Sequence, residues 1–194
     1  MHGLVNRSIQ NFLSDTYGQA LWQEVSAAAE LGFDGFEPML SYDDALTEAV
    51  LCAAAARLDR GREGVLEDIG TYLVSHPNLQ ALRRLLRFGG VEFSDFLYSL
   101  EDLQARGRLA VPELDLPRLE LQEHSPERFT LTCQTPHGGF GHAIVGVLRA
   151  MADDYGALVL LEHVGSNGDV EMIGIDLLDH QHAEGRRFEL AAAF

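Results

Sequence analysis

Phe93-Ser-Asp-Phe-Leu-Tyr-Ser-Leu-Glu-Asp-Leu-Gln104 is the stretch of this 194-residue chain that decides its fold. Its apolar side chains recur every three or four residues, which is typical of a helix with one buried face. We expect a single helix that places the Gln104 amide on or beside the inward face, because Gln104 follows Leu97 by seven residues and Leu100 by four. The predicted buried stripe consists of Phe93, Phe96, Leu97, Leu100 and Leu103.

The chain before this helix is also helical in pattern. Apolar residues recur at helical spacing in several stretches, and small or rigid residues separate these stretches. Glycine favours the turn after a helix, and the residue before a proline disfavours helical backbone. Asp43 or Asp44 is a suitable N-cap for the helix through Ala56. The expected helix ends are Gly18, Gly32, His76-Pro77 and Gly89-Gly90.

After Gly107 the apolar spacing changes to a period of two, which is typical of strands. A helix from Gly139 to about Asp154 separates the strands into two groups, and Gly165-Ser-Asn-Gly168 is expected to turn a hairpin. The predicted strands lie around Leu119–Leu121 and over Phe129–Cys133, Ala157–His163, Val170–Leu178 and Arg187–Ala192.

These patterns predict an α+β fold, in which an N-terminal helical lobe precedes an antiparallel sheet with one inserted helix. The length of the chain suits a single domain over residues 1–194. We expect the helical lobe to cover about residues 1–64 and the lobe with the sheet to cover about residues 65–194.

The chain is strongly acidic, with a formal net charge of −16 at pH 7 and an isoelectric point near 4.7. Such a surface repels phosphate, which argues against nucleic-acid binding. It is explained either by solubility alone or by a partner with a basic docking face. No apolar run approaches the ~20 residues of a membrane span, and Met1–Arg7 lacks the pattern of a signal peptide. A cytoplasmic protein without a membrane segment is expected.

The remaining reactive residues point to no familiar catalytic centre. Cys52 and Cys133 are far apart without C-x-x-C spacing, which excludes a disulfide framework, and Cys52 is expected to be a small core residue. Asp179-His-Gln-His182 could bind a metal, although histidines in a polar turn are usually solvated. Gly138-Gly-Phe-Gly141 could hold an anion or serve only as a tight turn. No nucleophile elbow, phosphate-binding loop or zinc helix motif is present, so no enzymatic activity is expected.

Taken together, the chain resembles the H-NOX (haem–nitric oxide/oxygen binding, HNOB) domain family. The resemblance rests on short elements that follow the family's order over nearly the whole chain, with the helix that ends at Gln104 in the place of the family's proximal helix. It implies the H-NOX fold and a haem pocket between the two lobes. The other elements are Met1-His-Gly3, Tyr17-Gly18, Trp22, Tyr42-x-Asp44, Leu66–Tyr72, Val111-Pro112, Leu116-Pro117 and the strand–turn–helix from Leu131 to Gly146.

The iron ligand of the family is replaced in this chain. In H-NOX domains a Leu-Asp-x-Leu-His ending supplies the histidine that holds the haem iron, whereas here the ending is Leu100-Glu-Asp-Leu-Gln104. A glutamine amide offers only a neutral carbonyl oxygen, which is a hard and weak ligand for ferrous haem. Alternatively, Gln104 is a polar residue at the edge of the stripe that reaches solvent or a backbone group.

The family's grip on the haem propionates, a Tyr-x-Ser-x-Arg motif, is also changed. The matching residues are Cys133-Gln-Thr135-Pro-His137. If strand alternation extends that far, Cys133, Thr135 and His137 share one face. Threonine can replace serine, but a thiol cannot replace a phenol, and imidazole lacks the permanent bidentate charge of arginine. Both departures predict a degenerate haem site, with haem binding absent or altered.

His137 is the candidate for a substitute iron ligand, and His76, His124 and His142 are weaker candidates. By the resemblance, Val5, Ile9 and Leu73 lie at or near the gas-binding side of the haem pocket, and Pro112 is also a pocket position. This side offers no hydrogen-bond donor, so a haem-bearing form is expected to favour nitric oxide over oxygen. Alternatively, these apolar residues belong simply to the core.

The resemblance implies a stand-alone sensor domain that regulates a partner in trans, such as a histidine kinase or a cyclic-di-GMP enzyme. One alternative is a haem-binding nitric oxide sensor in which His137 holds the iron. Another is a ligand-free protein-interaction module whose pocket is filled by side chains. If haem is absent, the ligand of a sensor is expected to be an unknown small hydrophobic molecule.

Overall fold

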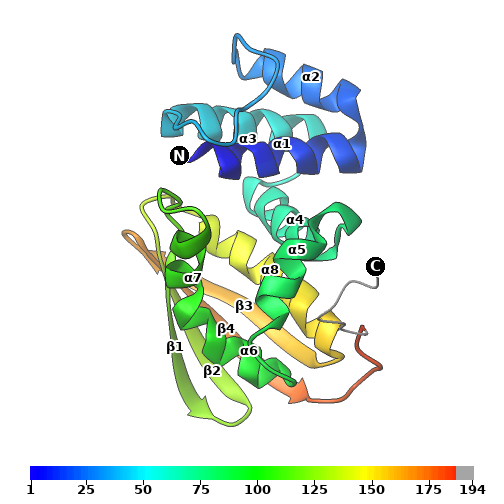
Figure 1. The fold of residues 1–194 in the computed structure, drawn as a ribbon, viewed down its shortest axis with the longest axis vertical. Coiled ribbons are helices and arrows are strands. Elements are labelled where there is room, and N and C mark those ends of the chain that lie inside the picture. Colours follow the sequence, from blue (N-terminus) through cyan, green and yellow to red (C-terminus); the bar gives the residue numbers. More distant parts are fainter. Residues whose placement is uncertain (187–194) are drawn as a thin grey trace.

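The computed structural model describes residues 1–186, and the strand predicted at Arg187–Ala192 lies outside the described residues. Helices α1 (Gly3–Tyr17), α2 (Gln19–Ala28) and α3 (Asp44–Leu58) stack at one end of the molecule, and the sheet forms the other end (Figure 1). Gly18 separates α1 from α2 with a φ of 94°, as its position in the sequence predicts. The carboxylate of Asp43 caps α3 by accepting a 2.9 Å hydrogen bond from the amide of Ala45.

Helix α4 (Arg62–Ser75) lies between the two ends (Figure 1). Its residues Val65, Leu66 and Ile69 pack into the apolar cluster of α1–α3, and Val74 packs into the cluster beneath the sheet. Because α4 carries side chains of both clusters, the division of the chain near residue 64 stays a prediction. A 3₁₀ turn, η1 (Pro77–Leu79), and α5 (Gln80–Arg87) follow α4.

The described residues form a four-stranded antiparallel sheet in the order β1-β2-β4-β3. Helix α8 separates β2 from β3 in the chain, so the predicted α+β architecture with one inserted helix is confirmed. The hairpin between β3 and β4 turns at Gly168–Asp169, and the predicted turn residue Gly165 lies within β3 instead, where it pairs with Met172 beside a bulge at Val164. The bounds are β1 (Arg118–Ser125), β2 (Arg128–Gln134), α8 (Phe140–Tyr155), β3 (Leu158–Asn167) and β4 (Val170–Asp179).

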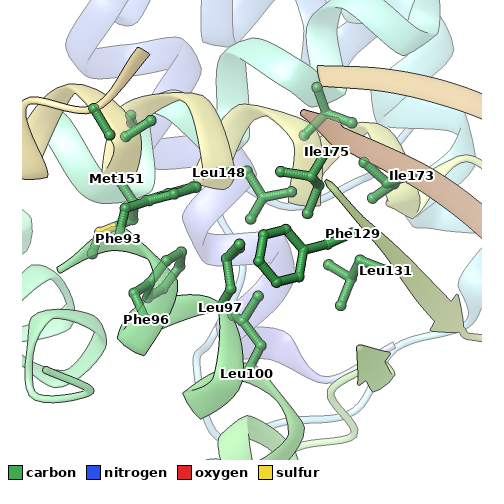
Figure 2. Packing of buried hydrophobic residues seen from close by; sticks show 14 of the residues in the cluster. Phe93, Phe96, Leu97, Leu100, Phe129, Leu131, Leu148, Met151, Ile173 and Ile175 are labelled. Atoms are coloured by element: carbon green, nitrogen blue, oxygen red, sulfur yellow. The ribbon is translucent and has the colours of Figure 1, made fainter. Parts of the chain in front are cut away.

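The stripe that decides the fold packs against the sheet and α8 (Figure 2). Phe93, Phe96, Leu97 and Leu100 are each at most 2% exposed. Burying one such side chain contributes roughly 1.5–3 kcal/mol, so this contact holds the sheet lobe together. The facing residues are Phe129, Leu131, Leu148, Met151, Ile173 and Ile175.

The prediction of one continuous helix over Phe93–Gln104 is wrong. The stretch consists of α6 (Phe93–Ser99), a 3₁₀ turn η2 (Leu100–Asp102) and α7 (Leu103–Ala110). The Ser99 carbonyl accepts a 2.7 Å hydrogen bond from the Arg106 guanidinium, and the Ser99 hydroxyl donates to the Phe96 carbonyl. These side-chain bonds replace backbone bonds of a regular helix at this point.

Cys52 is exposed, which contradicts its expected place in the core. Helix α3 buries Thr47, Val50, Leu51 and Ala54. Cys52 follows Leu51 directly, and one residue turns an α-helix by about 100°, so its thiol points away from that face. Within residues 1–186, no helix has the length and apolar character needed to span a bilayer.

Candidate functional site

Gln104 lies in the first turn of α7 and is partly buried. Its Nε2 donates a 2.8 Å hydrogen bond to the carbonyl of Leu116, just before β1. Nearby, Glu101 Oε1 accepts a 3.0 Å bond from the amide of Leu121, within β1. Because β1 is an edge strand, the Glu101 carboxylate occupies a backbone group of Leu121 that no neighbouring strand can pair. Gln104 therefore reaches a backbone group, the alternative expected from its position at the edge of the stripe.

Two adjoining hollows flank the Gln104 amide. The smaller one measures about 230 Å³ and brings Gln104 together with Thr135, Leu116 and Asp169. The larger one measures about 570 Å³ and extends along β1, between that strand and Ala105. Gln104 and Thr135, two of the positions expected in the haem pocket, thus line one hollow.

Cys133 and Thr135 are both buried, but their polar atoms serve the fold. Cys133 belongs to the core beneath the sheet, where burial and the nearby Glu171 carboxylate raise the pKa of its thiol to about 12. Thr135 Oγ1 accepts a 3.2 Å hydrogen bond from the amide of His137, and the Thr135 amide donates to the Asp169 carbonyl. The threonine hydroxyl therefore closes a local turn.

His137 does not share a face with Cys133 and Thr135, because β2 ends at Gln134 and the chain turns there. The expectation of a common face, which required strand alternation to continue, is therefore wrong. His137 Nδ1 lies 3.7 Å from Asp44 Oδ2, and its ring centroid lies 5.6 Å from that of Phe140. The N-terminal amine, and to a lesser extent His137, hold the pKa of Asp44 below its ordinary value. His137 thus belongs to the contact between the 135–139 loop and the start of α3.

The residues expected to line the gas-binding side form part of the helical core. Ile9 is 3% exposed, and Val5 and Leu73 are partly buried against the same apolar cluster of α1–α4. Pro112 is exposed in the segment after α7. The structure thus brings Val5, Ile9 and Leu73 together, whereas Pro112 lies outside their cluster.

The other candidate histidines have local partners. His76 packs on Tyr72, with 4.7 Å between ring centroids, and His124 Nε2 lies 2.9 Å from the Thr130 hydroxyl. The Asp179–His182 fragment is exposed, with 3.9 Å between its Asp179 and His182 side-chain atoms. In the part of the chain that the structure describes, no three His, Cys, Asp or Glu side chains converge as metal ligands.

Sequence reasoning missed Glu171, a carboxylate that is only 2% exposed on β4. Its oxygens accept 2.8 Å hydrogen bonds from the Gly139 amide and from His163 Nε2. The His163 ring stacks on His142 with 4.1 Å between centroids, and His142 Nδ1 lies 3.4 Å from Glu67 of α4. Glu171 therefore fixes the start of α8, where a negative charge is favourable. Its alternation with buried Ile173, Ile175 and Leu177 was the signal for an inward carboxylate.

The side chains around Gln104 do not fit an iron-bound haem. Iron in a haem is held by an imidazole nitrogen, a thiolate, a thioether or a phenolate. The Gln104 amide is bonded to the Leu116 carbonyl, the raised pKa of Cys133 keeps its thiol protonated, and His137 faces Asp44. None of these three side chains therefore presents an iron ligand to a position where haem iron could be held.

Comparison with known proteins decides the family. The family profile described as "Haem-NO-binding" (HNOB) matches residues 2–163. The chain belongs to the H-NOX family. Two curated relatives are soluble guanylate cyclase gcy-31 of Caenorhabditis elegans, 23% identical over 79% of this chain, and soluble guanylate cyclase 89Db of Drosophila melanogaster, 20% identical over 84%. This H-NOX chain covers only 22% and 24% of those relatives' own lengths.

Solved structures show the same H-NOX fold. A triple mutant of an H-NOX protein from S. oneidensis in the Fe(II) ligation state superposes with a TM-score of 0.78 at 18% identity, over 93% of this chain and 98% of that one. The Fe(II) unliganded H-NOX protein from K. algicida gives 0.75 at 16% identity, over 97% and 100%. The resemblance seen in the sequence is thereby confirmed. The family consists of haem-binding sensor domains rather than catalytic ones.

Proposed function

We propose that this H-NOX domain is a sensor or signalling domain that holds no histidine-ligated haem and that regulates a partner protein in trans. The observation that carries the proposal is the 2.8 Å hydrogen bond from the Gln104 amide to the Leu116 carbonyl. It commits the residue in the iron-ligand position to the backbone, and the amide oxygen that remains is a weak ligand for ferrous iron.

The altered propionate grip supports the same proposal. A charge-assisted hydrogen bond contributes about 1.5–3 kcal/mol, and arginine makes two of them to one carboxylate. The neutral Cys133 thiol lies in the core, and the Thr135 hydroxyl is bonded to the His137 amide. Haem would therefore lack an iron ligand and most of the hydrogen bonds to its propionates. The affinity of this chain for haem falls by several powers of ten as a result.

The proposed output is protein binding rather than catalysis. Candidate partners are a histidine kinase or a cyclic-di-GMP enzyme, as the sequence resemblance implies. The net charge of −16 favours a basic docking face on that partner and disfavours nucleic acid. A small hydrophobic molecule remains the expected ligand.

A haemin titration followed by absorption spectroscopy tests the haem part of the proposal. Wild-type protein should give no Soret band of a ligated haem, because no imidazole occupies position 104. Gln104→His should bind haemin more tightly than wild type, and the matched variant Gln104→Ala should not.

One outcome would contradict the haem part of the proposal. It is a stoichiometric wild-type complex that shows the ferrous spectrum of imidazole-ligated haem. If His137→Ala then removes that spectrum, His137 is the substitute ligand and the chain is a haem-dependent nitric oxide sensor.

The partner part is tested with purified histidine kinases and cyclic-di-GMP enzymes. Adding the chain should change the activity of its partner, and added salt should weaken the complex because surface charges steer it. If no such enzyme binds the chain or changes its activity, regulation in trans is wrong whatever the haemin titration shows.

A further inference from the structure

An aromatic-walled hollow of about 470 Å³ lies where α1 and α4 end, and Gln104 lines none of it. For brevity we call it the aromatic hollow. Its walls include four aromatic rings, and an Arg60–Asp68 ion pair stands beside them. The rings belong to Phe12, Tyr17, Tyr72 and His76.

The four rings contact one another edge to face or at a tilt. The centroids of Phe12 and Tyr72 lie 5.6 Å apart at 67°, and those of Phe12 and Tyr17 lie 5.7 Å apart at 89°. Tyr72 and His76 are 4.7 Å apart at 31°. Phe12 and Tyr72 are nearly buried, whereas Tyr17 is 41% exposed, so the hollow has a fixed floor and an open wall.

Negative charge predominates around the aromatic hollow. Helix α4 ends at Ser75 and directs the partial negative charge of its C-terminal carbonyls toward it, whereas the start of α2 at Gln19 offsets the end of α1 at Tyr17. Asp15 adds a full charge: its Oδ2 accepts a 2.6 Å hydrogen bond from the Tyr72 hydroxyl and lies 3.7 Å from His76 Nδ1. Burial, and to a lesser extent this bond to Asp15, raise the pKa of Tyr72, so the phenol stays neutral.

Arg60 is the positive group at the rim. It is already paired with Asp68, and its side chain is 45% exposed. Asp68 therefore offsets the charge of Arg60 locally, and Arg60 does not balance the charges of Asp15 and of the end of α4. A hard metal ion is a poor match for these walls, because Ca²⁺ and Mg²⁺ need converging oxygen ligands rather than rings.

We propose that the aromatic hollow binds an organic cation, a quaternary ammonium or guanidinium group. The faces of aromatic rings attract such cations, and sets of rings around one point are the usual recognition site for them. The guanidinium or ammonium group comes either from a free small molecule or from the side chain of a bound protein. The two sources share the same chemistry at the site, and the choice of probe separates them.

Titration by isothermal calorimetry tests the proposal with two pairs of probes. Choline is compared with 3,3-dimethylbutanol, its neutral carbon analogue, and N-acetylarginine amide is compared with N-acetylcitrulline amide. The cation of each pair should bind at least about tenfold more tightly than its neutral partner. Preference for choline indicates a free small molecule, and preference for the arginine probe indicates a side chain.

Two variants separate the charge from the rings. Asp15→Asn removes the charge at almost constant size, and Tyr17→Leu removes an exposed ring while keeping an apolar side chain. Each should weaken cation binding severalfold without changing the affinity for the neutral analogue. Tyr98→Leu is the matched control, since Tyr98 is 50% exposed elsewhere, on α6. Circular dichroism melting confirms that each variant is folded.

Three results would overturn the proposal. The first is equal binding of choline and its neutral analogue, which would show an apolar hollow only. The second is absence of saturable binding by both cations. The third is equal loss of binding in Tyr17→Leu and Tyr98→Leu, which would place the cation elsewhere.

Discussion

Gln104 uses its single amide to hold α7 against the chain that enters β1. The donor is its Nε2, and the acceptor is the otherwise unpaired carbonyl of Leu116. Position 104 could be located from the sequence, because helical spacing alone places it beside the buried stripe. The acceptor could not be predicted, since it lies 12 residues away in a segment without regular structure.

Gln104→Ala should lower the free energy of unfolding by about 0.5–1.5 kcal/mol, because one partly buried hydrogen bond is lost. Urea unfolding measures this change. The control is Gln122→Ala, an exposed residue of β1. Equal unfolding midpoints for the two variants would show that the amide bond adds nothing to stability.

The two thiols should differ sharply in reactivity. Cys52 is exposed and should react with a thiol reagent in the folded protein. Cys133 should react only on unfolding, because it is buried and its pKa is raised to about 12. Counting released chromophore before and after denaturation checks this, with Cys52→Ala as the control. Fast reaction of both thiols in the folded state would contradict the structure.

The raised pKa of Cys133 also has a consequence for alkaline stability. The unfolded thiol ionises near its ordinary value of 9, whereas the folded one retains its proton until about 12. The unfolded state then binds fewer protons, so this contribution to stability is full below about pH 9 and is lost as the pH rises toward 12. Cys133→Ala should remove that part of the pH dependence, as urea unfolding at several alkaline pH values can show.

At the scale of elements, most helices and strands follow local signals. Gly18 and His76-Pro77 end helices as their backbone preferences predict, and the alternation of Phe129, Leu131 and Cys133 gives β2. The break between α6 and α7 could not be predicted in the same way. It depends on a bond from the Arg106 side chain to the Ser99 carbonyl, which no pattern of apolar spacing reveals.

The crossing of α4 and α8 rests on two glycines. A Cβ added at Gly70 would collide with the backbone carbonyl of Ala143, and one added at Gly146 would collide with that of Glu67. Gly70→Ala and Gly146→Ala should each destabilise the protein by about 1–3 kcal/mol or more, because the helices must separate. Thermal unfolding measures the loss.

Gly64 offers the matched control for this crossing. It also lies in α4, but a Cβ there meets only the Arg60 side chain at 3.5 Å. Gly64→Ala should therefore stabilise the protein by about 0.4–1 kcal/mol. If Gly70→Ala behaved like Gly64→Ala, the two helices would not be in backbone contact.

Glu171→Gln should destabilise the start of α8 by about 1.5–3 kcal/mol, because the charged acceptor of the Gly139 and His163 bonds is lost. Hydrogen exchange at the Gly139 amide and urea unfolding report the change. Glu162→Gln, an exposed neighbour on β3, is the control and should have little effect. Unchanged protection of the Gly139 amide would contradict this role.

At the scale of the whole molecule, the H-NOX fold could be predicted because many weak elements occur in one order. The site could be predicted only in part. The departures at Gln104, Cys133 and His137 are visible in the sequence, but the partners that these residues take are not. Asp44 and Glu171 reach the site from distant parts of the chain, and only folding brings them there.

The balance of 30 acidic residues against 14 arginines predicts a response to salt. Repulsion among surface carboxylates acts against the compact state, and dissolved ions screen it. The thermal midpoint should rise by a few degrees when sodium chloride is added to low-salt buffer. A midpoint that falls instead would show that attractive ion pairs, such as that of Arg128 with Asp176, outweigh the repulsion.

The glycine contact between α4 and α8 also limits how the two lobes can move. Because backbone touches backbone at Gly70 and Gly146, neither helix can slide along the other without opening the crossing. A displacement of α4 therefore carries α8 with it, and α8 begins at the loop that holds Thr135 and His137. We therefore expect the helical lobe and this loop to move together whenever the α4–α8 pair tilts over the sheet.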